Sequence, residues 1–456
     1  MDYVSTRGSA PHLGFEGALL AGLANDGGLY VPETWPTARV DGGSYAQCAA
    51  AITHPFVNGD IPFDVYRALC EAAYSSFRHP QVAPLVEVAP DHYLLELFHG
   101  PTLAFKDVAL QLLGRLFDYV LAKRGERVMI VGATSGDTGS AAIDGVKHCD
   151  NVDIVILYPR GRVSEVQRRQ MTTVDSPNVH CVAIDGTFDD CQDLVKAMFN
   201  DEPFRKANNL SAVNSINWAR VMAQTVYYFT AVRALGRQAS FSVPTGNFGN
   251  VLAGWIARQM GADVHRLIVG SNSNDILTRF FESKEMSMRP VTPTLSPSMD
   301  IQVSSNFERL LFEMNHRDGA ATKEQLLGFR SAGSFGVSNQ QFDEWIAPVF
   351  RAHRSSDDET VATMRRVYGE TGMLIDPHTA VGLAAAVACC EAGVPTITLA
   401  TAHPAKFPDA VEKATGVRPA LPEHLADLFL RPERSTDLAN DLAEVERFVA
   451  SKRRAL

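Results

Sequence analysis

The segment HGPTLAFKD, His99 to Asp107, places a lysine where a reactive amine is useful. Lys106 follows an extended run, His92 to Phe98, and precedes a pattern that predicts an amphipathic helix over Val108 to Leu121. A lysine amine can form a Schiff base with an aldehyde such as that of pyridoxal phosphate. Most lysines near a helix start are solvated surface residues, so Lys106 alone does not establish this chemistry.

A glycine-rich turn far along the chain provides a second chemical feature. A strand predicted over Phe241 to Pro244 runs into this turn, and a helix pattern follows it directly. The turn consists of Thr245, Gly246, Asn247, Phe248, Gly249 and Asn250. Backbone N–H groups at a helix N-terminus bind phosphate, because the helix dipole leaves about half a positive charge there. Glycine allows that close approach and any positive φ. An ordinary tight turn is the structural alternative, but amine and turn together are what a pyridoxal phosphate enzyme needs.

A third loop follows the strand predicted over Arg127 to Val131 and contains Thr134, Ser135, Asp137 and Thr138 in the run GATSGDTG. It lacks the GK[ST] ending of an ATP-binding loop and the GxGxxG spacing of a dinucleotide site. A Ser/Thr/Gly-rich turn before a helix suits a carboxylate or a phosphate. Simple N-capping of the helix is the structural alternative.

A fourth loop, NSINWAR, opens a helix after a strand predicted over Leu210 to Val213. Asn214, Ser215 and Arg220 lie within about one helical turn there and could hold a second anion, with Arg220 supplying a charge-assisted contact. The alternative is an N-cap followed by a surface arginine. Two anion sites would accommodate one cofactor phosphate and one substrate phosphate.

Composition limits the function classes open to this chain of 456 residues. A net charge of −10 argues against nucleic acid as the main partner. The longest apolar run, Val381 to Cys390, is shorter than the ~20 residues of a membrane span, and the N-terminus lacks a signal-peptide pattern. Seven scattered cysteines without a CxxC pair predict reduced thiols in the cytoplasm, and no metal-ligand spacing occurs.

Short apolar runs alternate with helical periods over most of the chain, which predicts parallel sheets covered by helices on both faces. In such sheets ligands bind at the carboxyl ends of the strands, where the glycine-rich loops fall. Residues 80–90 read as a proline-rich connector, 284–300 as a long loop, and 425–450 as a helix with a closing tail. The strands are predicted at 127–131, 152–158, 179–184, 239–243, 266–270 and 396–400.

The motifs HGPTLAFKD, ATSGDTG, NSINWAR, PTGNFGN and LATAHPAKF, in this order, resemble the threonine synthase family. The opening YVSTRG and GLANDGGLYVPE, and the run SPSMDIQVSSNFERLLFE, resemble it too, so the likeness extends from residue 3 to about 415. It implies an α/β fold of the tryptophan-synthase-β-like type (fold type II), with two parallel or mixed α/β/α domains and an N-terminal segment. The implied divisions are 1–92, 93–222 with the lysine and the SGDTG loop, 223–425 with the cofactor-phosphate loop, and 426–456 as a helical tail.

The resemblance also implies residue roles and an activity. Lys106 would be the Schiff-base lysine and proton shuttle for pyridoxal 5'-phosphate, and Thr401 would lie at the pyridine nitrogen. Gly246, Asn247, Phe248, Gly249 and Asn250 would bind the cofactor phosphate. Thr134, Ser135, Asp137 and Thr138 would lie by the substrate carboxylate and the cofactor ring, and Asn214, Ser215 and Arg220 would face the substrate phosphate. The family turns O-phospho-L-homoserine and water into L-threonine and phosphate; its short form, which this chain resembles, lacks a regulatory S-adenosylmethionine site.

Asp137 departs from the wider fold group, many of whose members have asparagine in the corresponding loop. Asparagine can donate a hydrogen bond to the phenolic oxygen of the cofactor, whereas an ionised aspartate cannot. Short-form threonine synthases resemble this chain here, so the role of Asp137 stays open. Two other functions also stay open: a phospholyase or dehydratase of the same fold that releases a 2-keto acid, and a non-catalytic paralogue that binds the cofactor. A soluble cytoplasmic monomer or homodimer is expected, without membrane or nucleic acid partners.

Overall fold

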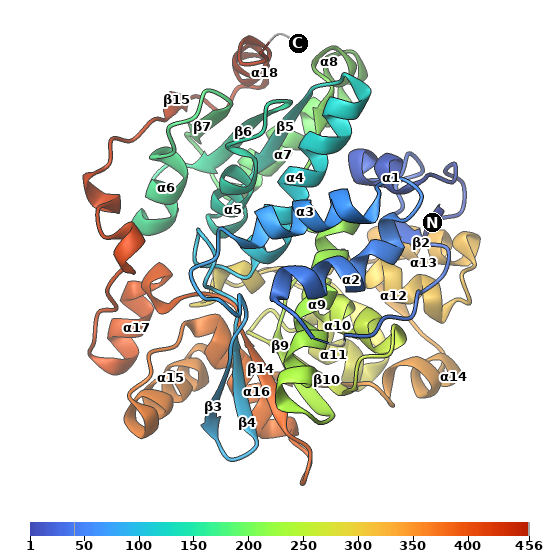
Figure 1. The fold of residues 1–456 in the computed structure, drawn as a ribbon, viewed down its shortest axis with the longest axis vertical. Helices are drawn as coiled ribbons and strands as arrows, with labels where there is room; N and C mark the ends of the chain where they lie inside the picture. Colours follow the sequence, from blue (N-terminus) through green and yellow to red (C-terminus); the bar gives the residue numbers. More distant parts are fainter. Residues whose placement is uncertain (41, 455–456) are drawn as a thin grey trace.

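We describe a computed structural model that covers residues 1–40 and 42–454, and Figure 1 shows two α/β halves stacked one above the other. The lower half is built on a six-stranded sheet of order β13-β10-β9-β14-β4-β3, in which only β3 runs antiparallel to its neighbour. Its strands are β3 (Leu85–Ala89), β4 (His92–Glu96), β9 (Ala239–Pro244), β10 (Val264–Ser271), β13 (Phe350–Arg354) and β14 (Thr396–Ala400).

The upper half contains a five-stranded, all-parallel sheet of order β15-β7-β6-β5-β8. Alternate residues of each strand face opposite helix layers: Val155 and Leu157 pack in one apolar cluster with Cys191 and Val445, while Ile154 belongs to the other. The strands are β5 (Val128–Ala133), β6 (Val152–Pro159), β7 (Val179–Ile184), β8 (Leu210–Ser211) and β15 (Thr436–Leu438). The helices beside them are α4 (Lys106–Arg124), α5 (Asp137–Val146), α6 (Glu165–Thr172), α7 (Phe188–Asn200), α8 (Glu202–Asn208) and α18 (Leu442–Ser451).

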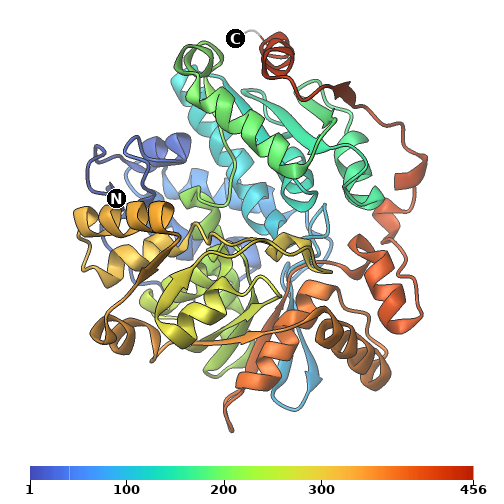
Figure 2. The same cartoon turned by 180° about the vertical axis from the view of Figure 1, so that it is seen from behind.

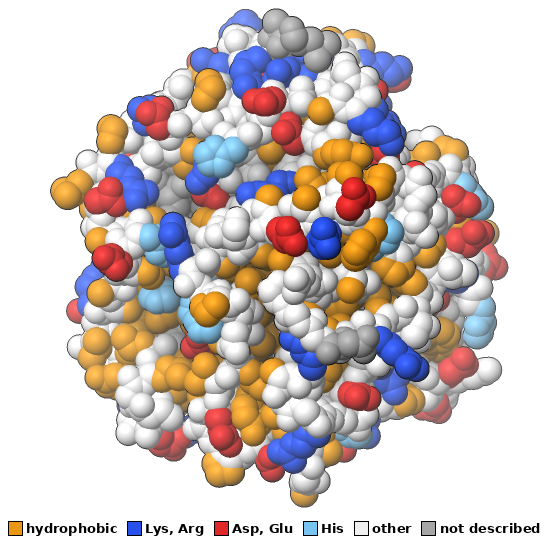
Figure 3. Space-filling model, viewed as in Figure 1, with side chains coloured by type: hydrophobic (Ala, Val, Ile, Leu, Met, Phe, Trp, Pro, Cys, Tyr) orange, Lys and Arg blue, Asp and Glu red, His pale blue; other side chains and the backbone are white. Residues whose placement is uncertain are grey.

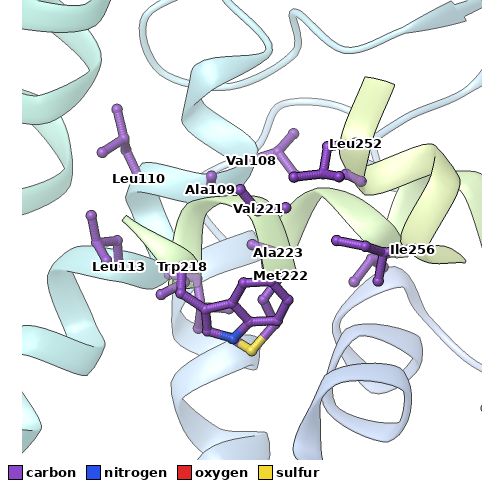
Figure 4. Packing of buried hydrophobic residues seen from close by; sticks show 14 of the residues in the cluster. Val108, Ala109, Leu110, Leu113, Trp218, Val221, Met222, Ala223, Leu252 and Ile256 are labelled. Atoms are coloured by element: carbon purple, nitrogen blue, oxygen red, sulfur yellow. The ribbon is translucent and has the colours of Figure 1, made fainter. Parts of the chain in front are cut away.

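Three helices that carry or adjoin candidate site residues pack against one another. Figure 4 shows Val108 and Leu113 of α4 beside Trp218 and Val221 of α9 (Trp218–Leu235), with Leu252 of α10 (Gly249–Gln259) next to them. Dense apolar packing of this kind resists displacement, because a core side chain is in contact on all sides. The helices that begin at Lys106 and next to Arg220 are therefore held in one rigid core.

The remaining elements frame this core. The N-terminal segment holds β1 (Tyr3–Ser5), paired antiparallel with β2 (Tyr30–Pro32), and three helices that pack on α4 and α9. The other elements are α1 (Phe15–Ala21), α2 (Tyr45–Val57), α3 (Phe63–Tyr74), α11 (Ile276–Ser283), β11 (Glu285–Ser287), η1 (Pro297–Met299), α12 (Phe307–Met314), α13 (Gly319–Ala332), β12 (Ser334–Gly336), α14 (Asn339–Gln341), η2 (Phe342–Ile346), α15 (Asp357–Thr371), α16 (Pro377–Cys389), η3 (Pro404–Lys406), α17 (Pro408–Thr415), η4 (Glu423–Leu425) and η5 (Leu428–Leu430).

The predicted strands are confirmed with small shifts, β7 and β14 match their predicted bounds, and the helix predicted over Val108 to Leu121 lies within α4. Two predictions were wrong. Residues 80–90 are not merely a connector, because Leu85–Ala89 forms β3, and residues 425–450 are not one helix, because they include strand β15 and only Leu442–Ser451 forms the helix α18. The prolines of residues 80–90 lie outside strand β3, where they do not interrupt the hydrogen bonds to β4. Strand β13 and helix α2 were not predicted.

Two strands cross the predicted divisions. Strand β4, which begins at His92 on the first predicted boundary, joins the sheet of the large half, and β15 of the tail joins the small sheet. In Figure 1 the chain after α17 runs up one side of the molecule to reach β15, and Figure 2 shows the same strap from behind. The four-part division stays a prediction, with the tail tied to the small half.

The charges on the surface concern nucleic acid partners, and the apolar character of the helices concerns membranes. On the face in Figure 3, Lys and Arg side chains are interspersed with Asp and Glu instead of gathering into one basic area. Among the described residues, no helix combines the length and apolar character needed to cross a membrane.

Candidate active site

Lys106 is the first residue of α4, and the backbone before it is fastened to the end of β14. The amide of Phe105 donates to the carbonyl of Thr401 at 2.8 Å, and His403 donates to Leu103 at 3.0 Å. Leu103 has φ +64°, a left-handed conformation that a leucine adopts only where the surroundings hold it. Lys106 therefore projects from a constrained loop at the carboxyl ends of the large sheet.

Asp107, next to Lys106, is buried and stabilises the same loop through hydrogen bonds. Its carboxylate accepts from the Thr102 amide at 2.8 Å and from the Thr102 hydroxyl at 2.6 Å. A Cβ added to Gly100 would come within 2.5 Å of the Asp107 side chain, so glycine is required there. Burial, with a contribution from nearby Asp144, raises the pKa of Asp107 to about 7.

The Asp137 carboxylate lies against the amine of Lys106. Its Oδ2 is 3.4 Å from Lys106 Nζ and accepts from the Ser298 hydroxyl at 3.1 Å. Its Oδ1 accepts from Gln167 Nε2 at 2.8 Å and lies 3.1 Å from Lys406 Nζ. Four donors thus surround one buried carboxylate, and they come from both halves of the molecule.

The charges around Asp137 set its protonation state. Burial alone would raise the pKa of Asp137, but Lys406 and Lys106 outweigh it and hold that pKa well below its ordinary value. Asp137 is therefore an ionised, acceptor-only group at neutral pH. Burial lowers the pKa of Lys106; Asp137 opposes this effect, whereas Lys406 and Arg220 add to it. A lysine with a lowered pKa releases its proton more readily, which suits a nucleophile or a base.

The loop that carries Asp137 is held in place by its own threonine. Thr134 Oγ1 accepts from the amides of Gly136 and Gly139, each at 2.9 Å. Thr134 is buried, Thr138 is partly exposed, and Ser135 is exposed. A Cβ on Gly139 would come within 2.5 Å of Thr134, so the turn depends on this close approach. Thr134 thus supports the loop, and Ser135 and Thr138 are freer to reach a ligand.

The predicted phosphate loop follows β9 and opens α10. The amides of Gly246, Asn247 and Phe248 have no acceptor in the part of the chain that the structure describes. Phe248 has φ +62°, whereas Gly246 and Gly249 do not have positive φ, so the expected left-handed residue is Phe248 rather than a glycine. Its buried ring packs against Phe307 at 5.3 Å between centroids, which holds that conformation.

Arg220 lies in the first turn of α9 and is buried without a carboxylate. Its Nη1 donates to the Val213 carbonyl at 3.1 Å, and its Nε has no partner among the described residues. Burial lowers the pKa of Arg220 to about 10, which still leaves it charged at neutral pH. A buried cation without a counter-charge is costly unless an anion joins it, so this arginine marks an anion site.

Two buried side chains, Asn306 and Arg309, hold the rest of the NSINWAR loop. Asn306 Nδ2 donates to the carbonyls of Ser215 and Asn247, both at 3.1 Å, and so ties this loop to the phosphate loop. Buried Arg309 donates to the carbonyl of Ile216 at 2.6 Å. Ser215 is partly exposed and Asn214 is exposed, so their side chains are available to a ligand.

Sequence reasoning missed three residues that meet at Asp137: Gln167, Ser298 and Lys406. Lys406 stands within the quoted motif LATAHPAKF and Ser298 within SPSMDIQV, so each motif contained a signal. Gln167 lies in a helix, α6, whose sequence shows no chemical motif.

Several histidines lie in or near the segment that precedes Lys106. His99 Nε2 is 2.8 Å from Glu96 Oε2, and its ring lies 5.0 Å from that of His79. Burial lowers the pKa of His403 to about 4; His99 and His424 contribute in the same direction, and the carboxylates of Asp376 and Glu96 oppose them.

Acid is therefore expected to destabilise the protein through His403. The unfolded chain binds a proton at His403 near pH 6.5, whereas the folded chain resists until about pH 4. The stabilisation is full above pH 6.5 and is lost as the pH falls toward 4, by at most about 3 kcal/mol. His403→Asn keeps the cap on Ala405 N but does not titrate. Urea unfolding of both proteins from pH 7 to pH 4 should show the steeper loss in the unsubstituted chain; parallel curves would contradict this.

Three family models match successive parts of this chain. The model "Threonine synthase N terminus" matches residues 2–74, "Pyridoxal-phosphate dependent enzyme" matches 78–326, and "Threonine synthase, C-terminal" matches 379–449. A threonine synthase of Pseudomonas aeruginosa is 55% identical, over 99% of this chain and 98% of that protein.

The chain belongs to the threonine synthase family.

Solved structures of threonine synthases agree with this placement. The pyridoxal phosphate-bound threonine synthase from Brucella melitensis is 54% identical, with a TM-score of 0.97 and full coverage of both chains. The yeast threonine synthase is 39% identical, with a TM-score of 0.94 over 99% of this chain and 98% of that one. Maize serine racemase, at 13% identity and a TM-score of 0.51, shares the fold alone. The chain is a pyridoxal phosphate enzyme of fold type II, and the predicted fold, family and cofactor are confirmed.

The side chains and amides of the site fit this cofactor. The free amides of the loop that begins at Gly246 suit its phosphate, and the constrained amine of Lys106 suits its aldehyde. A Cβ on Gly246 would come within 3.1 Å of the Met299 backbone, so a side chain there would occupy the space beside the loop.

Proposed function

We propose that this threonine synthase converts O-phospho-L-homoserine and water into L-threonine and phosphate by β,γ-replacement, the last step of threonine formation. The observation that carries the substrate assignment is the buried Arg220, whose Nε has no partner among the described residues and whose charge is close enough to Lys106 to lower the pKa of that lysine. The amides from Gly246 to Phe248 already offer one phosphate site. A second anion site beside the reactive amine is what a phosphorylated substrate requires.

We propose residue roles that follow the family resemblance and are compatible with this arrangement. Lys106 binds the cofactor and moves protons, and Thr401 lies at the pyridine nitrogen. Gly246, Asn247, Phe248, Gly249 and Asn250 hold the cofactor phosphate. Thr134, Ser135 and Thr138 lie by the substrate carboxylate, Asp137 by the cofactor, and Asn214, Ser215 and Arg220 by the substrate phosphate.

The chemistry requires proton transfer at two neighbouring carbons. When bound, the cofactor stabilises negative charge at the substrate α-carbon. Lys106 takes the α-proton and then a proton from Cβ, because the loss of phosphate from Cγ requires both and one mobile amine can reach both. Arg220, with Asn214 and Ser215, stabilises the charge on the departing phosphate. Lys106 then returns the two protons, one to Cγ, which becomes the methyl group of threonine, and one to the α-carbon. Water adds its hydroxyl group at Cβ, and its remaining proton passes to the released phosphate.

The identity of the products tests this proposal. Incubation of the purified protein with O-phospho-L-homoserine should give threonine and inorganic phosphate in equal amounts. A same-fold phospholyase or dehydratase would release 2-oxobutyrate instead, and a non-catalytic paralogue would leave the substrate unchanged. Either outcome would overturn the proposal.

The cofactor-phosphate assignment predicts a loss of cofactor affinity in Gly249→Val. The new Cβ would lie 3.3 Å from Asn306 Nδ2, and its methyl groups would crowd the amides that face the phosphate. We expect the dissociation constant of the cofactor to rise by about tenfold or more, equivalent to ~1.4 kcal/mol. Gly369→Val is the matched control, because Gly369 is exposed on helix α15 with open space around it. Equal cofactor affinity in both folded variants would count against this loop.

We also propose a cytoplasmic enzyme that acts as a monomer or homodimer. Its seven cysteines are unpaired, and five of them are buried, as is common in a reducing compartment. Light scattering of the purified protein would give its mass in solution.

A further inference from the structure

Lys406 is a second lysine at the site, and nothing in the reaction above uses it. It ends η3, just after β14, and its side chain is 0% exposed. Its Nζ donates to the Thr102 carbonyl at 2.7 Å and to Gln170 Oε1 at 2.8 Å. It also forms an ion pair with Asp137, whose Oδ1 lies 3.1 Å from Nζ. This buried ammonium group therefore has two hydrogen-bond acceptors and a counter-charge.

Asp137 thus forms ion pairs with two lysines, which differ in how firmly they are held. Its Oδ1 faces Lys406 and its Oδ2 faces Lys106, and the carboxylate is only 5% exposed. Lys106 must exchange its partners during turnover, because its nitrogen binds the cofactor and later carries protons. Lys406 is held by fixed acceptors on three separate segments, so its charge stays in place.

We propose that Lys406 is a positioning residue, a permanent counter-charge that keeps the Asp137 carboxylate ionised and turned toward Lys106 throughout turnover. A buried carboxylate without a partner is strongly unfavourable, and Lys406 supplies that partner whenever Lys106 is engaged elsewhere. Asp137 can then accept a hydrogen bond from the Lys106 nitrogen or the cofactor but cannot donate one. This proposal rests on Lys106 as the cofactor-binding residue and is independent of the identity of the substrate.

Other charged groups also face Asp137 and the two lysines. His378, on α16, is the third group whose charge acts on Asp137, after the two lysines. His378 pairs with Asp376 at 2.8 Å, and Asp300 lies near it. The charge of Arg220 acts to lower the pKa of Lys106, and the charge of Lys406 acts to lower the pKa of Asp107. The remaining contacts of Asp137, from Gln167 and Ser298, are neutral, so the two lysines dominate.

The first test is Lys406→Met in the cofactor-loaded enzyme. The absorbance of the bound cofactor is recorded from neutral to alkaline pH, where it reports the proton on the Lys106 nitrogen. Removing a nearby positive charge should move this transition to higher pH by about one unit or more. Lys413→Met, which removes an exposed lysine on the next helix, should leave it unchanged. Loss of packing alone would lower thermal stability without moving the transition, and that outcome overturns the proposal.

A second variant guards against failure of the first to fold. Lys406→Met alone should also weaken cofactor binding, because it leaves the buried Asp137 carboxylate without its permanent counter-charge. Lys406→Met combined with Asp137→Asn removes both charges, so the double variant should bind the cofactor at least about tenfold more tightly than Lys406→Met alone. A double variant as impaired as the single one would overturn the proposal. An unsubstituted enzyme without cofactor absorbance would instead show that the assignment of Lys106 itself is wrong.

Discussion

Lys106→Ala is expected to abolish the absorbance of protein-bound cofactor and to reduce turnover by about 10⁴-fold or more. The variant loses both the nitrogen that binds the cofactor aldehyde and the base that moves protons. Lys406, the second lysine at the site, cannot take over, because it is buried, donates to Thr102 and Gln170, and is ion-paired with Asp137. The fold should persist, because the Lys106 side chain contributes little to the core beneath α4.

Two measurements check this expectation. Borohydride reduction of the unsubstituted enzyme followed by peptide mapping should place the pyridoxyl group on Lys106. Lys123→Ala is the control, since Lys123 is an exposed lysine on the same helix that pairs with Glu16. A label on Lys123 or Lys147, or cofactor absorbance that survives in Lys106→Ala, would contradict the assignment.

The second large effect is expected at Arg220. Arg220→Ala should leave the cofactor absorbance intact while lowering kcat/KM for O-phospho-L-homoserine by about 10²-fold or more. A charge-assisted contact contributes ~2–3 kcal/mol, and further loss follows if it stabilises the leaving phosphate. The protein should remain folded, because Arg220 makes one backbone hydrogen bond and leaves its Nε unpaired among the described residues.

Arg220→Met and Arg233→Ala make this prediction specific. The methionine keeps most of the side-chain volume, so a similar loss of kcat/KM would assign the effect to charge. Arg233 lies in the last turn of the same helix and is exposed, so its replacement should leave kcat/KM near that of the unsubstituted enzyme. Collapse of cofactor binding in Arg220→Ala, with substrate binding preserved, would mean that the two anion sites are exchanged.

Local signals in the sequence predicted most of the parallel architecture. Helix α9 has a continuous apolar period and a glycine after its end, and β14 is a short apolar run between turn residues. The missed elements carry weaker signals. Strand β13 has the sequence FRAHR, whose charged residues are tolerated because it lies at the sheet edge. Helix α2 contains Pro55, and β3 lies between prolines.

The environment of Asp137 could not be predicted, because it depends on contacts between distant segments. Lys406 is 300 residues from Lys106 in the sequence, yet both reach the same carboxylate. A motif search can identify a lysine or an aspartate, but burial and pairing decide their charges. The sequence left open whether Asp137 can donate, and the two lysines answer that it cannot.

In the proposed replacement reaction the Cγ–O bond breaks and water adds at Cβ. Turnover of O-phospho-L-homoserine in heavy-oxygen water tests it most directly, with mass spectrometry of both products. We expect one heavy oxygen in the hydroxyl of threonine and none in the released phosphate. Label in the phosphate, or 2-oxobutyrate as the main product, would contradict it.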